Sequence, residues 1–155
     1  MPLSREMQRL RAEHAALVTL SRIILDMTDA PRPPPPAELA SARSQLRDAL
    51  IRHLKCEDWA LYPRLMGSGD PEMARITREF EREMGELGTD FIAYDDKWTP
   101  ARIAAEWADF CRETRIMFDM LAMRVAREER DLYPLADKLC ASAGAAVRDV
   151  STISS

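Results

Sequence analysis

The stretch HLKCEDWALYP, residues 53–63, determines the fold and the kind of site that we expect for this chain. If the stretch is helical, His53 and Glu57 lie four residues apart, so their side chains project from one face, one turn apart. An imidazole and a carboxylate at this spacing can reach a single metal ion. The stretch EERDLYP, residues 128–134, repeats the acidic pair and the Leu-Tyr-Pro ending. This repeat predicts that the second half of the chain copies the first.

The composition is that of one soluble helical domain. A chain of 155 residues, 46% hydrophobic and 31% charged, can bury most of its apolar surface in a single core. The net charge of −4 gives no reason to expect nucleic acid or an anionic membrane as a partner. The N-terminus lacks the apolar core of a signal peptide, and no later run could span a bilayer, so we expect a cytoplasmic protein. The three cysteines lie far apart in the sequence and are interpreted as reduced packing residues.

Apolar residues recur at helical spacing in four segments, which predicts an all-α, up-down-up-down antiparallel four-helix bundle over residues 1–140. The predicted helices cover residues 3–28, from 36 or 37 to a bend or end at Pro63, from 71 to about 94, and from 100 to about 138. Proline lacks the amide donor of a helix interior and clashes with the preceding turn, so the proline-rich residues 30–36 are predicted to connect the first two helices. Asp70-Pro71 and Thr99-Pro100 each offer a side-chain cap followed by proline, a common helix start. Residues 141–155 are predicted to form a flexible tail.

Polar residues interrupt the apolar seams of these helices at similar heights. His14 lies in the first helix, His53 and Glu57 in the second, and Arg124 and Glu128 in the fourth. Aligning the two halves of the chain places two residues where symmetry would require two more histidines. These residues are Met84 and Arg124. A complete site of this design would hold two metal ions with Glu57 and Glu128 as bridging carboxylates.

The chain resembles the hemerythrin-like, HHE cation-binding family of four-helix bundles over residues of about 3 to 138. Three motifs carry the resemblance: EHxxL at residues 13–17, HxxxEDxxLYP at residues 53–63 and EExxLYP at residues 128–134. The resemblance implies a non-haem di-iron centre that senses or binds oxygen, nitric oxide or iron. It also implies that four residues are metal ligands, namely His14, His53, Glu57 and Glu128. Met84 and Arg124 do not match family ligands.

Three interpretations of these residues follow. In the first, the polar groups form a metal-free buried network in which Arg124 neutralises Glu57 and Glu128. In the second, one Fe, Mn or Zn ion binds to His14, His53 and the two carboxylates, and Arg124 takes the place of the second ion. In the third, a full di-iron centre is present, although a chain with two histidines lacks the further imidazoles that such a centre needs.

We also expect a regulatory or interaction protein rather than an enzyme. No nucleophile with an adjacent base and no glycine-rich phosphate loop occurs in the sequence. Apolar stripes on the sides of the first and fourth helices predict a surface for a homodimer or a protein partner. The two stripes consist of Leu20, Ile23 and Met27, and of Ile116, Met120 and Met123.

Overall fold

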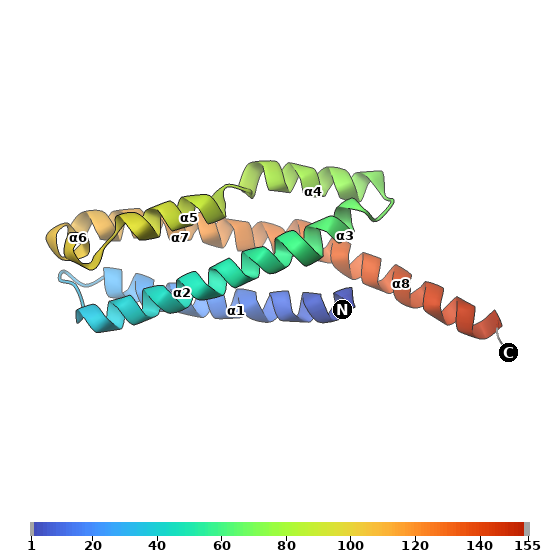
Figure 1. The fold of residues 1–155 in the computed structure, drawn as a ribbon, viewed down its shortest axis with the longest axis horizontal. Coiled ribbons are helices and arrows are strands. Elements are labelled where there is room, and N and C mark those ends of the chain that lie inside the picture. The colour runs from blue at the N-terminus through green and yellow to red at the C-terminus, as the bar shows by residue number, and fades with distance from the viewer. Residues whose placement is uncertain (1, 154–155) are drawn as a thin grey trace.

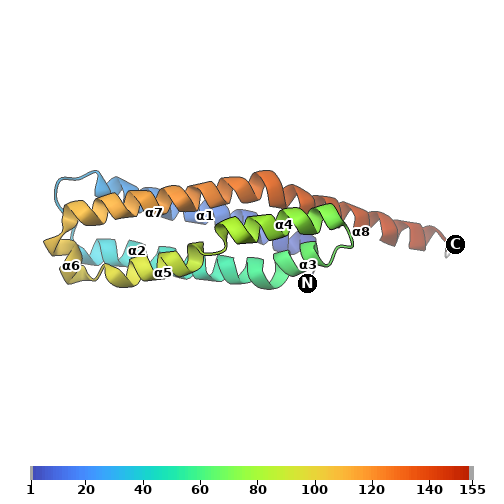
Figure 2. The same cartoon turned by 90° about the horizontal axis from the view of Figure 1, so that it is seen from above.

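A computed structural model describes the backbone of residues 2–153 and the side chains of residues 2–144. Four helical arms run side by side in alternating directions, and the last arm extends beyond the bundle as α8 (Figures 1 and 2). The predicted all-α antiparallel bundle is therefore confirmed. The helices of the first two arms are α1 (Leu3–Thr28), α2 (Pro36–Cys56) and α3 (Tyr62–Met66). Those of the last two arms are α4 (Pro71–Met84), α5 (Leu87–Lys97), α6 (Pro100–Ala105), α7 (Trp107–Arg127) and α8 (Tyr133–Ile153).

The predicted helix starts have the expected caps. The Asp70 carboxylate accepts hydrogen bonds from the backbone amides of Glu72 and Met73, and Pro71 is the first residue of α4. The Thr99 hydroxyl accepts a bond from the backbone amide of Arg102 at the start of α6. These bonds satisfy amide groups that have no partner within the helix, and they fix where the third and fourth arms begin.

The third arm is not the single helix that the apolar pattern predicted. It is interrupted at Gly85 and Glu86, and its second part ends at Lys97 rather than near Tyr94. A Cβ atom added at Gly85 would lie 2.3 Å from the Glu81 carbonyl oxygen, so a side chain here would force the backbone to shift. The interruption leaves the carbonyl group of Met84 at the end of α4, where it needs a partner from outside the helix.

The second and fourth arms each contain one π-helical turn, η1 (Glu57–Leu61) and η2 (Glu128–Leu132). In an α-helix, a proline ring clashes with the carbonyl four residues earlier and offers that carbonyl no donor. The amide of Tyr62 donates to the Glu57 carbonyl five residues back, which widens the helix just before Pro63. The helical backbone consequently continues to Met66 instead of ending at Pro63. The turn η2 occupies the same position before Pro134.

The fourth arm also departs from a single uniform helix. Glu106 has non-helical backbone angles and separates α6 from α7. The indole of Trp107 donates to the Ala30 carbonyl, which ties this bend to the connector between α1 and α2. Helix α8 runs to Ile153, so residues 141–153 are helical in the structure. The flexibility of residues 141–155 stays a prediction, because the side chains from Ala145 onward lie outside the described part of the chain.

The apolar interior forms two clusters with a polar layer between them. On α1, Leu10 belongs to one cluster and Leu17 to the other, and His14 lies between them. The other two arms that contribute to the layer follow the same order: Leu50 and Leu61 flank His53 and Glu57, and Leu121 and Leu132 flank Arg124 and Glu128. Each fully buried Leu, Phe or Met side chain stabilises the fold by about 1.5–3 kcal/mol. The two clusters therefore hold the polar layer in place from both sides.

Candidate metal centre

Five polar residues meet in the layer between the clusters, and none of them is more than 4% exposed. They are His14, His53, Glu57, Arg124 and Glu128. The two imidazole rings are 4.6 Å apart between their centroids, which agrees with the similar heights expected from the sequence. The structure thus brings together every ligand position that the sequence predicted on the first, second and fourth arms.

The histidines and carboxylates of this group have the arrangement of a metal site. His14, His53, Glu57 and Glu128 each offer one ligand atom, and these four atoms lie within 4.8 Å of one another. The distance is 3.2 Å from His53 Nε2 to Glu57 Oε1 and 3.4 Å from His14 Nε2 to Glu128 Oε2. Ligands of one zinc or iron ion lie about 2.0–2.2 Å from the ion, and hence about 3–4 Å from each other. These four residues could hold one ion.

Three buried atoms at this site lack a hydrogen-bond partner, and they support the same conclusion. They are His53 Nε2, Glu57 Oε1 and Glu128 Oε2. Among the described side chains only one other buried polar atom, on Arg43, is in this condition. Buried polar atoms without protein partners are rare and costly, so three that converge on one point form a place where a cation could bind.

A second layer of carboxylates orients the histidines. His53 Nδ1 is 2.9 Å from the Glu13 carboxylate, and His14 Nδ1 is 3.0 Å from that of Glu129. If the carboxylates are ionised, each Nδ1 must donate, which leaves Nε2 free to face the site. This is the usual arrangement around a metal-binding histidine.

The Arg124 guanidinium group contacts both carboxylates of the cluster. Arg124 Nε is 2.9 Å from Glu128 Oε1, and Nη2 is 3.5 Å from Glu57 Oε1. The other donors bind the Tyr62 hydroxyl at 2.8 Å and the Met84 carbonyl at 3.0 Å. Arg124 therefore binds both carboxylates and also caps the interrupted helix α4. These contacts place a positive charge, rather than a further imidazole, beside Glu57 and Glu128.

Met84 contributes its backbone rather than its side chain. Its side chain is half-buried against the apolar cluster that contains Phe80. The alignment of the two halves correctly placed residue 84 beside residue 124, but the contact uses the Met84 carbonyl oxygen.

Sequence reasoning did not identify four residues that complete the site, namely Glu13, Glu129, Tyr62 and Tyr133. The two carboxylates cross over, since Glu13 precedes His14 but orients His53, and Glu129 follows Glu128 but orients His14. The Tyr133 hydroxyl lies 2.9 Å from His14 Nε2 and 3.4 Å from Glu57 Oε2. The repeated Leu-Tyr-Pro motif was the sequence signal that could have identified the two tyrosines. In the structure, each tyrosine directly follows a π-helical turn that starts at Glu57 or Glu128.

Burial and charge affect the two histidines in opposite directions. Burial lowers the pKa of His14. Burial also disfavours charge on His53, but the carboxylates of Glu57 and Glu13 outweigh it and raise the pKa of that residue. Burial and the Glu57 carboxylate raise the pKa of Tyr133 far above its usual value. Without a metal, these shifts favour a proton on His53 over one on His14, and they favour the neutral hydroxyl form of Tyr133.

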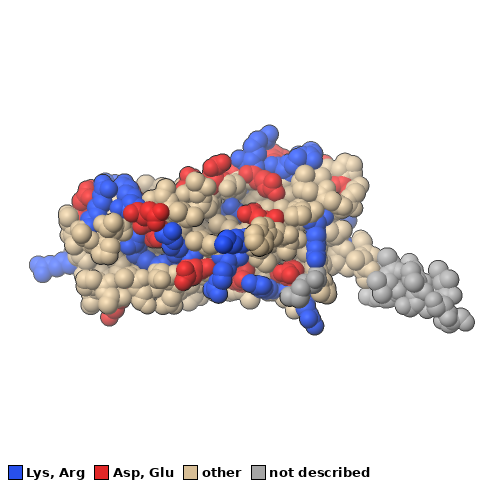
Figure 3. Space-filling model, viewed as in Figure 1, with Lys and Arg blue, Asp and Glu red and all other residues tan. Residues whose placement is uncertain are grey.

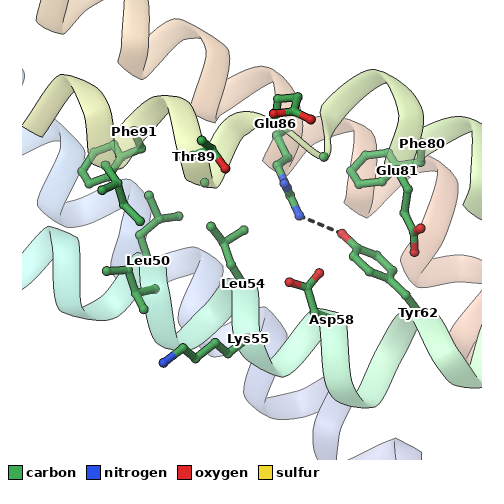
Figure 4. A pocket seen from close by; sticks show the side chains of 15 residues that line it. Leu50, Leu54, Lys55, Asp58, Tyr62, Phe80, Glu81, Glu86, Thr89 and Phe91 are labelled. Atoms are coloured by element: carbon green, nitrogen blue, oxygen red, sulfur yellow. Dashed lines mark hydrogen bonds between the residues drawn. The ribbon is translucent and has the colours of Figure 1, made fainter.

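A pocket of about 610 Å³ opens beside Arg124, between α2 and the break that separates α4 from α5. Figure 4 shows the Tyr62 hydroxyl in this pocket with its bond to the guanidinium group, and Asp58 nearby. Apolar walls from Leu50 and Phe91 alternate with acidic groups such as Glu81. Elsewhere on the face shown in Figure 3, basic and acidic side chains are interspersed.

The helical bundle and the buried His/Glu cluster together define a cation-binding bundle protein. Residues 6–136 match the Hemerythrin HHE cation binding domain, so the chain belongs to this family. Comparisons with curated proteins and with solved structures gave no match. No helix in the described part of the chain combines the length and apolar character that a membrane span requires.

Proposed function

We propose that this protein is a hemerythrin-like sensory or regulatory protein that binds one Fe, Mn or Zn ion. His14, His53, Glu57 and Glu128 would hold the ion, and Arg124 takes the place of the second ion. The observation that carries the proposal is the convergence of three unpaired buried atoms on one point, from His53, Glu57 and Glu128. Nitrogen and oxygen donors in this combination suit these divalent metals.

The charges of the site support a single ion. Two ionised carboxylates in the core need two positive charges, and Arg124 supplies one of them. The other comes either from a proton on His53 or from a metal ion. A proton on His53 Nε2 can be shared with Glu57 Oε1 at 3.2 Å, but it leaves Glu128 Oε2 without a partner. A metal ion binds His53 Nε2 and both carboxylate oxygens, so it satisfies all three atoms. When bound, the ion supplies redox or Lewis-acid chemistry, while the protein residues fix its position.

A metal titration of metal-free protein tests the proposal. Ferrous, manganous or zinc ions should raise the melting temperature, because an ion at 100 times its dissociation constant stabilises the native state by about 2.7 kcal/mol. The variant His53→Ala should lose this response, and Glu79→Ala, which changes an exposed carboxylate on α4, should keep it. A parent protein that shows no shift with any of these ions would favour the metal-free network instead.

We also retain the proposal of a homodimer or partner surface on the outer arms. On α7 the side chains of Ile116, Met120 and Met123 are 58%, 42% and 57% exposed. On α1, Leu20 and Met27 pack against the core, and Ile23 is the exposed member of the predicted stripe. Sedimentation of the parent and of Met120→Glu tests this surface, since a dimer that forms through α7 should dissociate in the variant.

A further inference from the structure

The Tyr133 hydroxyl lies among the ligand atoms of the proposed site, although no motif assigns it a role there. Its oxygen is 2.9 Å from His14 Nε2 and 3.4 Å from Glu57 Oε2. The longer separation falls within the range of about 3–4 Å between ligand atoms around one ion, and the shorter one is close to it. Tyr133 itself is fully buried, so its hydroxyl faces protein groups rather than solvent.

The hydrogen bonds define what this hydroxyl does in the metal-free protein. His14 Nδ1 faces the Glu129 carboxylate, so Nδ1 donates and Nε2 accepts. Tyr133 must then donate its proton to Nε2, the same atom that an ion would bind. Binding of an ion removes this acceptor, and the tyrosine oxygen is left beside the ion with only the longer contact, 3.4 Å to Glu57 Oε2, for its proton.

We infer that Tyr133 is a fifth ligand, whose phenolate oxygen binds the ion held by His14, His53, Glu57 and Glu128. This inference rests on the proposed function, and it favours iron among the candidate metals, because tyrosine is an established iron ligand. The O–H bond of Tyr133 breaks, its electron pair forms the bond to iron, and the proton passes to water. A bound cation drives such a step by stabilising the anionic form of its ligand.

The paired residue in the first half of the chain offers a matched control. Tyr62 occupies the same place after η1, but its hydroxyl accepts a bond from Arg124 and no described contact joins it to the two histidines. A cationic donor occupies the position that an ion would need in order to reach Tyr62. The two tyrosines should therefore differ in their response to iron.

The test uses the full chain, loaded without oxygen with one equivalent of ferrous iron and then oxidised by one equivalent of ferricyanide. We expect a visible phenolate-to-iron(III) charge-transfer band, with tyrosine ring vibrations enhanced in the resonance Raman spectrum. Tyr133→Phe should bind iron and lose the band completely, and Tyr62→Phe should keep it. Iron content and circular dichroism are measured on each sample.

The outcomes separate this inference from the proposed function. Bound iron without the band in the parent, or a band that survives in Tyr133→Phe, overturns the role of Tyr133 and leaves the four-ligand site standing. A parent that binds no iron under these conditions overturns the role of Tyr133, and a parent that also fails to respond to manganese and zinc in the metal titration overturns both. If Tyr133→Phe does not fold, the tyrosine vibrations of the parent and their persistence in Tyr62→Phe still decide the assignment.

Discussion

Arg124 and Glu128 lie one turn apart at the junction of α7 and η2 and form an ion pair within the core, with 2.9 Å between Nε and Oε1. In the first half of the chain the matching positions are His53 and Glu57, also four residues apart and 3.2 Å from Nε2 to Oε1. The matching carboxylates of the two halves, Glu57 and Glu128, therefore have different partners at this spacing. One half keeps an imidazole that can bind a metal ion, and the other half carries a cation of its own.

Removing the Glu128 carboxylate should strongly destabilise the metal-free protein. Arg124 would lose its shortest ionic contact within the core, and breaking such a buried pair costs about 3–5 kcal/mol. Glu57→Ala should cost less, because Arg124 is 3.5 Å from Glu57 and would keep Glu128. Urea unfolding of the parent and both variants measures the order. A Glu128→Ala protein as stable as the surface control Glu79→Ala would show that the buried pair contributes nothing.

Loss of the Glu13 carboxylate should weaken metal binding more than it weakens the fold. Glu13 is half-buried and holds His53 Nδ1 at 2.9 Å, so it fixes which nitrogen faces the site. Removing such a partner typically lowers metal affinity about 10–100-fold. In Glu13→Ala we expect this loss in a competitive titration with a chelator. Arg9→Ala, which removes the exposed partner of Glu13, should match the parent, and equal affinities for all three proteins would contradict the orienting role.

Metal affinity should rise with pH. The carboxylates around His53 raise its pKa, so a proton occupies the site to a higher pH and must leave before an ion can bind. Below that pKa the affinity should fall by about tenfold per pH unit. In the metal-free protein the sign is opposite: the protonated His53 stabilises the fold below its unfolded pKa, and this contribution disappears as pH rises through the raised pKa. Titrations between about pH 5.5 and about pH 8 compare both trends. A flat affinity profile would exclude His53 as the competing group.

The substitution of Arg124→His together with Met84→His should create a second site. Both missing imidazoles would be restored, and the fixed positive charge would be removed, while Glu57 and Glu128 stay in place. We expect uptake of iron to rise to about two ions per chain, with the near-ultraviolet absorption of an oxo-bridged pair. Met84→His alone should not bind more than the parent, because the guanidinium group still repels a second cation. A folded double variant that binds no more iron than the parent would refute the exclusion by Arg124.

Much of this architecture follows from residue spacing. The apolar seams and the two Asp/Thr-Pro caps predict the arms, and the seam interruptions at His14, His53 and Glu128 predict which residues meet. Helix spacing fixes these contacts because residues four apart share a face.

The features that spacing does not predict depend on local backbone geometry and on contacts between arms. The interruption at Gly85 occurs within a continuous apolar pattern, and the π-helical turns shift the residues after Glu57 and Glu128 relative to an ideal helix. The roles of Glu13 and Tyr133 arise across different arms, so the position of each along its own helix does not reveal its partner.

The most direct test of this account is the number of irons per chain in protein purified from iron-replete cells, measured by elemental analysis against an accurate protein concentration. Four ligands on one side of the polar layer and Arg124 on the other predict one iron per chain in the parent, and none in His53→Ala. Two irons per chain would contradict the exclusion of the second ion by Arg124. A parent without metal that also takes up no iron, manganese or zinc on reconstitution would show that His14, His53, Glu57 and Glu128 form a metal-free network.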